Sequence, residues 1–406
     1  MQENSPLDNP NLVKVYAADI KLGMYMSQPD RSWLDTSFMF QGFLVNNEKL
    51  LREVRTECEF IFIDKTKSVL QAAVGQLRPV EPPKAKKGKP FEQHIENAYK
   101  EHQASLSEIK QVLHCIQRGE AINLTKIRDS VNSCVVSIMD NPNAMLWLSK
   151  LRNRDYYTAE HSLNVGILAM ALGNHLGFDR ATLETLGLCG MLHDVGKMKL
   201  DQEVLNKPAK LSDEEFEIIK QHCALGKEIL EKDTNLPEVS IEAAYSHHER
   251  IDGKGYPRGI KAETLSRHAR IISIVDTYDA ITTTRCYCDS RPATEAIKIL
   301  FDGRGTQFDS ALVEQFIECL GIYPTGSLVE LHSGEGAVVI DSDKLNRLHP
   351  RVTIVLDENK SDCPPLLVNT LDYKTRPGGR TIKKPLDENQ YHIDLQDVFD
   401  HFQSKW

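Results

Sequence analysis

The spacing of hydrophobic positions divides the chain into three parts with different periods. Up to about residue 76, short apolar runs such as FMFQGFLV and FIFID alternate with turn residues, and residues 47–57 between them have a helical pattern. Short runs bounded by turn residues are typical of strands. We therefore expect a small α/β domain over residues 1–77.

A helical period dominates the middle of the chain. Residues 78–90 combine four prolines with five basic residues, which indicates an exposed linker whose charge serves solvation rather than nucleic-acid binding. From Phe91 to Ile116, apolar residues recur at the intervals of a long amphipathic helix. Further helices are predicted near residues 125–139, 158–176, 181–192, 212–231, 239–247, 264–283, 292–301 and 309–319.

Beyond residue 320 the period changes to short β-branched runs, SLVELH, GAVVID, VTIVLD and PLLVNTL, separated by Gly, Asp, Asn and Pro. These runs predict a β-rich extension over residues 326–406. The chain is thus expected to be mainly α. Connecting helices over 91–145 lead into a helical catalytic candidate over 146–325.

Composition limits the partners and the location. The 406 residues carry a net charge of −9, which argues against direct DNA binding and against broad attraction to a membrane surface. The nine cysteines lack the spacing of a zinc knuckle, which favours reduced thiols. The N-terminus has no apolar leader, and no stretch approaches the roughly 18 apolar residues of a membrane helix. We expect a cytoplasmic protein.

The densest chemistry lies in HHERIDGKGYP, residues 247–257, and in the preceding HDVGK, residues 193–197. Imidazole and carboxylate together suit Mn, Fe, Ni or Zn better than Mg or Ca. His193 and Asp194 are adjacent at the end of a predicted helix, so they can point at two neighbouring centres, with the carboxylate as a bridge. Lys197 lies on the same side if the turn stays helical, where it can meet a phosphate.

Other polar positions are ambiguous from their own surroundings. His161 lies in a helix that is apolar all round, where a core histidine bonded to a main-chain carbonyl is the simpler interpretation. His222, in an amphipathic helix, is equally consistent with an exposed side chain. Asp276 and Asp279 share one helical face among Ile, Val and Tyr, where buried carboxylates demand a cation. Helix capping or ion pairing is the alternative for this pair.

Taken together, His161, HDVGK, His222, HHERIDGKGYP and DTYDA resemble the HD-GYP family of metal-dependent phosphodiesterases, over roughly residues 150–330. The N-terminal segment, with LGMYM and SWLDTSF, is similar to a domain of uncharacterised role that often precedes the catalytic domain. The resemblance implies an all-helical HD-type domain with two divalent transition-metal ions such as Fe, Mn or Ni. Carried over, it implies metal ligation by His161, His193, Asp194, His222, His247, His248 and Asp276, with Asp194 bridging.

Some family members hold a third ion through a glutamate one helical turn before the first histidine. In this chain that place is Tyr157, and Glu160 is next to His161 and should point away from its ligand face. We therefore expect two ions rather than three.

The resemblance also implies the reaction, in which two ions activate a water that hydrolyses a cyclic dinucleotide. The substrate would be cyclic di-GMP, cut to pGpG, GMP or both, or 3'3'-cyclic GMP-AMP. Asp194 and Lys197 would be the catalytic residues. Glu249 and Asp279 would form a second shell that orients imidazoles or Lys197.

Substrate contacts are expected from Lys197, Tyr256 and Arg285. The family usually carries a further basic residue where this chain has Cys288, and Arg291 is the candidate to replace it. The loss of a cation there bears on affinity and base preference.

Two other functions remain as alternatives. A receptor or scaffold would use the same pocket without turnover, which Cys286 and Cys288 favour. A nucleotide phosphohydrolase of the wider HD superfamily would explain HDVGK but leaves the GYP segment without a role. The resemblance allows GGDEF-type cyclase domains as partners, docked at residues 252–257, and a homodimer.

Overall fold

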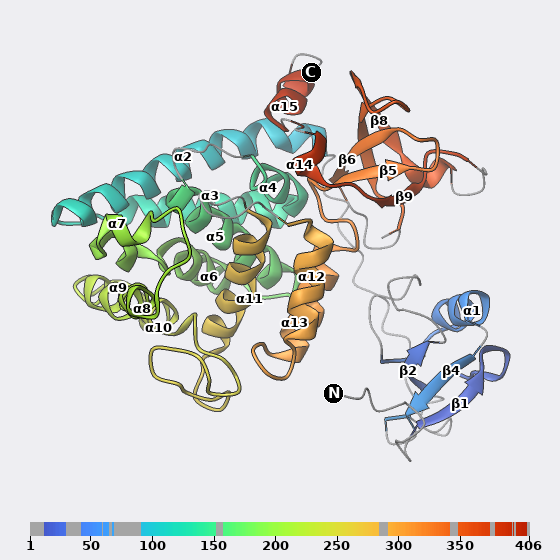
Figure 1. The fold of residues 1–406 in the computed structure, drawn as a ribbon, viewed down its shortest axis with the longest axis horizontal. Coiled ribbons are helices and arrows are strands. Elements are labelled where there is room, and N and C mark those ends of the chain that lie inside the picture. The colour runs from blue at the N-terminus through green and yellow to red at the C-terminus, as the bar shows by residue number, and fades with distance from the viewer. Residues whose placement is uncertain are drawn as a thin grey trace. The chain divides into compact units, whose positions relative to one another are not determined.

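The computed structural model describes residues 12–29, 42–58, 60–64, 67–68, 91–151, 157–283, 291–341, 348–373, 378–391, 393 and 395–403. The chain divides into two compact units, Met1–Lys87 and Gly88–Trp406 (Figure 1). The predicted linker at 78–90 and the predicted substrate contact Arg285, with Cys286 and Cys288, lie outside the described residues.

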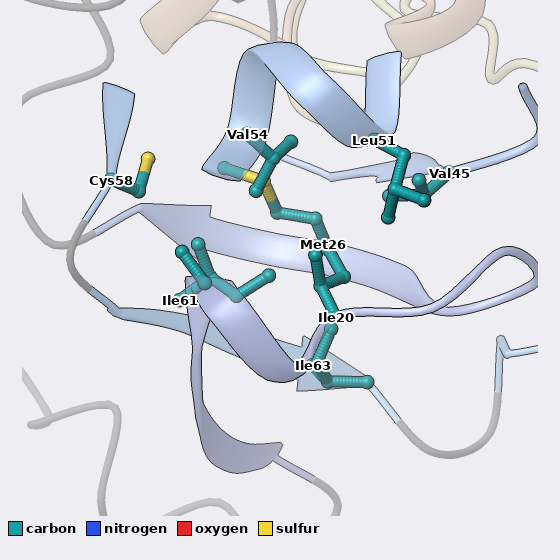
Figure 2. Packing of buried hydrophobic residues seen from close by; sticks show 9 residues of the cluster. Ile20, Met26, Val45, Leu51, Val54, Cys58, Ile61 and Ile63 are labelled. Atoms are coloured by element: carbon teal, nitrogen blue, oxygen red, sulfur yellow. The ribbon is translucent and has the colours of Figure 1, made fainter. Parts of the chain in front are cut away.

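The first unit is an antiparallel sheet with a helix, and its strand order is β1-β4-β2-β3. The elements are β1 Leu12–Tyr16, the 3-10 turn Ala17–Asp19, β2 Tyr25–Pro29, β3 Phe43–Leu44, α1 Glu48–Glu57 and β4 Phe60–Asp64. Ile61 and Ile63 alternate along β4 and share a core with Met26 and with Leu51 and Val54 of α1 (Figure 2). The α/β prediction for this part is confirmed.

Helices make up most of the second unit, which confirms the mainly α prediction. They are α2 Phe91–Arg118, α3 Thr125–Asp140, α4 Pro142–Leu148, α5 Tyr157–His175, α6 Arg180–Leu192, α7 Gln202–Leu205, α8 Asp213–Lys220, α9 His222–Leu230, α10 Glu238–Ser246, α11 Arg267–Thr282, α12 Ala293–Asp302 and α13 Ser310–Leu320. The single helix predicted over 212–231 is divided at Gln221, so His222 begins α9 instead of lying inside a longer helix.

Helix α5 forms the centre of the helical core. Every residue from Ala159 to Gly173 is buried, and α5 packs against α6 and α11 among others. A helix that is apolar on all sides is stable only when neighbours cover it completely. The same burial carries the polar side chain of His161 into the interior.

The C-terminal part contains a second antiparallel sheet, with strand order β8-β7-β6-β5-β9. Its strands are β5 Leu328–Leu331, β6 Gly336–Asp341, β7 Arg351–Leu356, β8 Asp362–Asn369 and β9 Ile382–Pro385, with a 3-10 turn at Thr370–Tyr373. The first four coincide with the predicted β-branched runs, and β9 is additional to them. Val329, Val339 and Ile354 lie in its core.

The chain ends in helices α14, Glu388–Tyr391, and α15, Leu395–Gln403. Phe399 is 1% exposed, and its ring centroid lies 4.4 Å from that of Tyr99 on α2 and 6.1 Å from that of Trp147 on α4. The region predicted as a β-rich extension therefore ends in a helix that packs on the helical core. Leu395, Val398 and Phe399 have the helical spacing that explains it. Among the helices that the structure describes, none combines the length and apolar character needed to cross a membrane.

Candidate metal centre

His161 is positioned by two carboxylates of α11. Its Nδ1 donates to Asp279 Oδ2 at 2.8 Å, and its Nε2 lies 3.0 Å from Asp276 Oδ1. The two aspartates are three residues apart and therefore share one face of α11. Asn164, one turn after His161 on α5, donates to the other oxygen of Asp279 at 3.3 Å. Asp279 is thus the outer partner of the imidazole, and Nε2 faces the interior of the cluster.

Asp194 lies between two groups of histidines and offers one oxygen to each. Its Oδ2 is 3.2 Å from His193 Nε2 and 3.6 Å from His161 Nε2. Its Oδ1 is 3.4 Å from His222 Nε2 and 3.7 Å from His247 Nε2. We call His161, His193 and Asp276 the Asp276 side of the cluster, and His222 and His247 the His247 side.

Main-chain carbonyls orient the remaining imidazoles. The Nδ1 atoms of His193, His222 and His247 donate to carbonyls three residues earlier, over 2.7, 2.6 and 2.9 Å respectively. This local bond forms because His193 and His247 end helices α6 and α10 and His222 begins α9. Each ring therefore presents Nε2, and the Nε2 atoms of His222 and His247 are 3.3 Å apart.

His248 stands at the edge of the cluster. Its ring centroid is 4.1 Å from that of His247, and its Nδ1 is 4.0 Å from Asp276 Oδ2. Its side chain keeps 27% exposure, in contrast to the fully buried His193, so it lies on the accessible side.

The donor set fits metal ions. His161 Nε2, His193 Nε2 and Asp194 Oδ1 are buried without a hydrogen-bond partner among the described residues. Buried polar atoms in native proteins are normally satisfied, so such orphans call for a missing partner. Four overlapping groups have ligand atoms within 4.8 Å of one another, and they include all seven residues predicted as ligands, His161, His193, Asp194, His222, His247, His248 and Asp276.

Electrostatics point the same way. Burial lowers the pKa of His193, but the adjacent Asp194 carboxylate outweighs burial and raises that pKa to about 10. Burial raises the pKa of Asp194, but His193 and Lys197 hold it well below its usual value. The Asp194 carboxylate thus stays ionised in a buried environment, where it is stable only with positive charge nearby.

The HDVGK turn packs tightly on the start of α9. The turn is the 3-10 helix Val195–Lys199. A Cβ on Gly196 would lie 1.9 Å from the carbonyl oxygen of His222, so only glycine permits this approach. Lys197, with 20% of its side chain exposed, donates from Nζ to Asp194 Oδ2. It is therefore within reach of a ligand at the cluster.

Glu249 was predicted to orient an imidazole or Lys197, but its observed partners lie in the GYP loop. Its carboxylate accepts from the main-chain N–H groups of Arg258 at 2.7 Å and Ile260 at 3.1 Å, and so anchors the GYP loop. A Cβ on Gly255 would lie 2.4 Å from Arg250 N, so this loop also needs glycine where it returns to the HHER segment. The anchored loop places the ring of Tyr256 4.7 Å from that of His248.

Helix α8 adds residues that the sequence analysis did not select. The ring of Phe216 lies 6.1 Å from that of Tyr256, and Lys220 Nζ lies 4.8 Å from the Phe216 ring and 5.6 Å from the Tyr256 ring. Phe216 is 43% exposed. Phe216 and Lys220 are four apart on α8 and share one face of it, and the exposure of Phe216, which singles it out, is visible only in the structure.

Two other predicted positions have local partners. Arg291 pairs with Glu295 at 3.0 Å, and its side chain is 52% exposed, so its observed partner is on α12. Tyr157 stacks on His161, with ring centroids 6.0 Å apart and planes at 3°. An aromatic ring therefore occupies the place where a further carboxylate would stand.

The comparisons with known proteins agree with this geometry. Residues 142–312 match the HD domain family, and residues 12–127 match a domain of unknown function, DUF3391. A cyclic di-GMP phosphodiesterase of Pseudomonas aeruginosa is 33% identical over 354 residues, which cover 84% of this chain and 85% of that protein.

Other relatives match shorter stretches. A 3'3'-cGAMP-specific phosphodiesterase of Vibrio cholerae is 34% identical over 157 residues, 39% of this chain and 36% of that protein. Among solved structures, the HDG"Y"P protein of Bdellovibrio bacteriovorus has a TM-score of 0.47 at 17% identity, over 75% of this chain and 98% of that one. Because the Pseudomonas relative matches along most of both chains, and the HD domain match spans the buried cluster, the chain belongs to the HD-GYP family of cyclic-dinucleotide phosphodiesterases.

Proposed function

We propose that this chain hydrolyses cyclic di-GMP, to pGpG, GMP or both, or 3'3'-cyclic GMP-AMP, at a centre of two divalent ions. The observation that carries the proposal is the orientation of Asp194, whose two oxygens face different pairs of histidines. A bridging carboxylate has this arrangement. The names of the relatives support both substrates.

The residues divide between the ions. His161, His193, Asp194 and Asp276 would hold the first, and Asp194, His222, His247 and His248 the second. Ions bound by these residues would supply positive charge to the phosphate oxygens and would lower the pKa of a coordinated water. The mixed nitrogen and oxygen donors favour transition metals such as Fe, Mn or Ni. Tyr157, stacked on His161, supports a count of two rather than three.

Lys197 and Asp194 are the residues of the chain with direct roles in the proposed reaction. Asp194 is ionised because its pKa is depressed, so it is available as a bridge. The partly exposed ammonium of Lys197 lies beside it and can donate to a phosphoryl oxygen as negative charge grows there. No nucleophilic side chain is required.

The nucleotide would extend from the cluster along Tyr256 and helix α8. Exposed aromatic rings stack on nucleobases without requiring a particular base, and Phe216 presents such a ring. The ammonium of Lys220 lies over both rings and donates to Glu217 on the same helix, and we expect it to turn to the second phosphate of a bound cyclic dinucleotide.

The receptor or scaffold is the second candidate. Cys286 and Cys288 favour this candidate. The family usually carries a proline at the first of these positions and a basic residue at the second. For either function we also propose a cytoplasmic location, a homodimer, and docking of a GGDEF-type domain at residues 252–257.

The deciding experiment uses the full chain, depleted of metal and reconstituted with Fe, Mn or Ni. Each preparation is analysed for metal content and incubated with cyclic di-GMP and with 3'3'-cyclic GMP-AMP, and products are separated by chromatography. Linear dinucleotide or mononucleotide that requires added metal supports the enzyme. Tight binding of the cyclic form without product in every metal would refute hydrolysis and favour the receptor. Three ions per active chain would refute the two-ion centre.

A further inference from the structure

The thiol of Cys223 lies inside the His247 side of the cluster, and the mechanism above does not use it. The residue is completely buried. Its Sγ is 3.5 Å from His222 Nε2. The ligand atoms of Cys223, His222 and His247 all lie within 4.8 Å of one another.

These separations are those of atoms that share one ion. With metal–nitrogen bonds near 2.1 Å and metal–sulfur bonds near 2.3 Å, a tetrahedral ion places two nitrogens about 3.4 Å apart and a nitrogen and a sulfur about 3.6 Å apart. Around His222 Nε2 the observed distances are 3.3 Å to His247 Nε2, 3.4 Å to Asp194 Oδ1 and 3.5 Å to Cys223 Sγ.

A second observation also points to a ligand at this place. Asp194 Oδ1, the oxygen that faces His222 and His247, is buried without a hydrogen-bond partner among the described residues. Cys189 provides the contrast, because it is equally buried in the helical core but its Sγ contacts Ser240 Oγ at 3.7 Å and Val239 O at 3.9 Å. Burial alone therefore does not bring a cysteine to a histidine in this core.

We propose that Cys223 is a further ligand of the second ion, the one that Asp194, His222, His247 and His248 would hold, which would give this ion a sulfur donor that its neighbour lacks. The inference rests on the proposed metal centre and concerns its ligands. On metal binding, the thiol would release its proton to bulk water and the thiolate would donate to the metal. Because thiolate is a soft ligand, this position prefers Zn, Fe or Co over Mn, while the Asp276 side, with its harder carboxylate, discriminates less.

The test is an absorption spectrum of the full chain, depleted of metal and titrated with Co(II) in the absence of substrate. A thiolate bound to cobalt gives a charge-transfer band in the near ultraviolet, which nitrogen and oxygen ligands do not give. We expect this band in the wild type, its loss in Cys223→Ser and Cys223→Ala, and its retention in Cys189→Ser. Stoichiometric cobalt binding without the band in the wild type, or its persistence in Cys223→Ser, would overturn the proposal.

A second measurement needs no variant. X-ray absorption at the zinc edge of the zinc-loaded wild type should detect a sulfur at about 2.3 Å, and a shell of nitrogen and oxygen alone contradicts the proposal even if both variants fail to fold. Where they fold, competition with a chromophoric chelator should give a loss in zinc affinity of at least about tenfold. Neither readout involves turnover, so a chain with the sulfur ligand but no hydrolysis would refute the proposed function and leave this inference standing.

Discussion

The two sides of the cluster both use imidazoles, but His161 on the Asp276 side is held differently from the others. His193, on the same side, donates to a main-chain carbonyl as His222 and His247 do. On the Asp276 side, carboxylates contact both nitrogens of His161, Asp279 at Nδ1 and Asp276 at Nε2. On the His247 side, main-chain carbonyls accept from both Nδ1 atoms. A carboxylate partner makes an imidazole a more basic ligand than a neutral carbonyl does.

The charge states of the free imidazoles follow this difference. Burial lowers the pKa of His161, but the nearby carboxylates of Asp276 and Asp279 outweigh burial and raise it. Burial lowers the pKa of His222 to about 3, because the nearby Asp194 carboxylate compensates only in part. The pKa values of two equally buried histidines are thus shifted in opposite directions by their neighbours.

The largest effect should come from the residue that both sides share. Asp194→Ala removes a ligand from each ion, so we expect metal content to fall at both sides and hydrolysis to decrease by well over about a hundredfold, beyond the cost of losing an outer-shell partner. Metal analysis with a product assay measures both, and circular dichroism checks the helices. If one ion stays bound with its affinity unchanged, Asp194 does not bridge.

Lys197→Ala should strongly lower turnover but leave metal bound at both sides of the cluster. Loss of one donor to the growing charge of the transition state lowers kcat by about 10² to 10³, while metal content stays at the wild-type value. The matched control is Lys199→Ala, an exposed lysine in the same 3-10 turn. Equal losses in the two variants, or loss of metal in Lys197→Ala, would contradict the role.

An effect confined to one side is expected for Asp279→Asn. The amide oxygen can still accept from His161 Nδ1 but carries no negative charge, so metal affinity of the Asp276 side should fall by about 10- to 100-fold while the His247 side is unchanged. Calorimetric metal titration resolves the two sites. Asp302→Asn, at an exposed position of α12, serves as the control. Equal weakening of both sites would remove the distinction between the sides.

The smallest effect should come from Phe216 on helix α8, which lies outside both sides of the cluster. Phe216→Ala removes a stacking surface worth about 1 kcal/mol or more, which corresponds to a rise in KM of about fivefold with kcat and metal content retained. Ile218→Ala changes another exposed apolar residue of α8 and should leave KM unaltered. A KM that responds equally to both substitutions would indicate that α8 does not contact the base.

The spacing of hydrophobic residues was sufficient to predict an element where that spacing agrees with how the element is buried in the fold. The apolar circumference of α5 predicted its burial, and the runs that became β5 to β8 were recognisable because strands alternate or stay apolar over short lengths. The prediction missed that α15 returns to the helical core. Its spacing is helical, but its partners Tyr99 and Trp147 are far away in sequence.

The site was predictable in its residue types and less so in its contacts. Glu249 follows two histidines and was assigned to orient a ligand, but the fold uses both its oxygens on main-chain N–H groups of the GYP loop. Arg291 was expected at the substrate, and its observed partner is Glu295. Each outcome depends on which groups the fold leaves unsatisfied, and a linear pattern does not contain that information.

The sequence by itself indicated the family and the helical periods, because these depend on residue type and spacing, and the family resemblance implied the seven candidate ligands. Only the tertiary structure decided that the two oxygens of Asp194 face different histidines, and that Cys223 Sγ lies 3.5 Å from His222 Nε2 among the same group of side chains. Helices α6, α9, α10 and α11 come from distant parts of the chain, and a bridge or a shared ligand is defined by distances of a few ångströms between them.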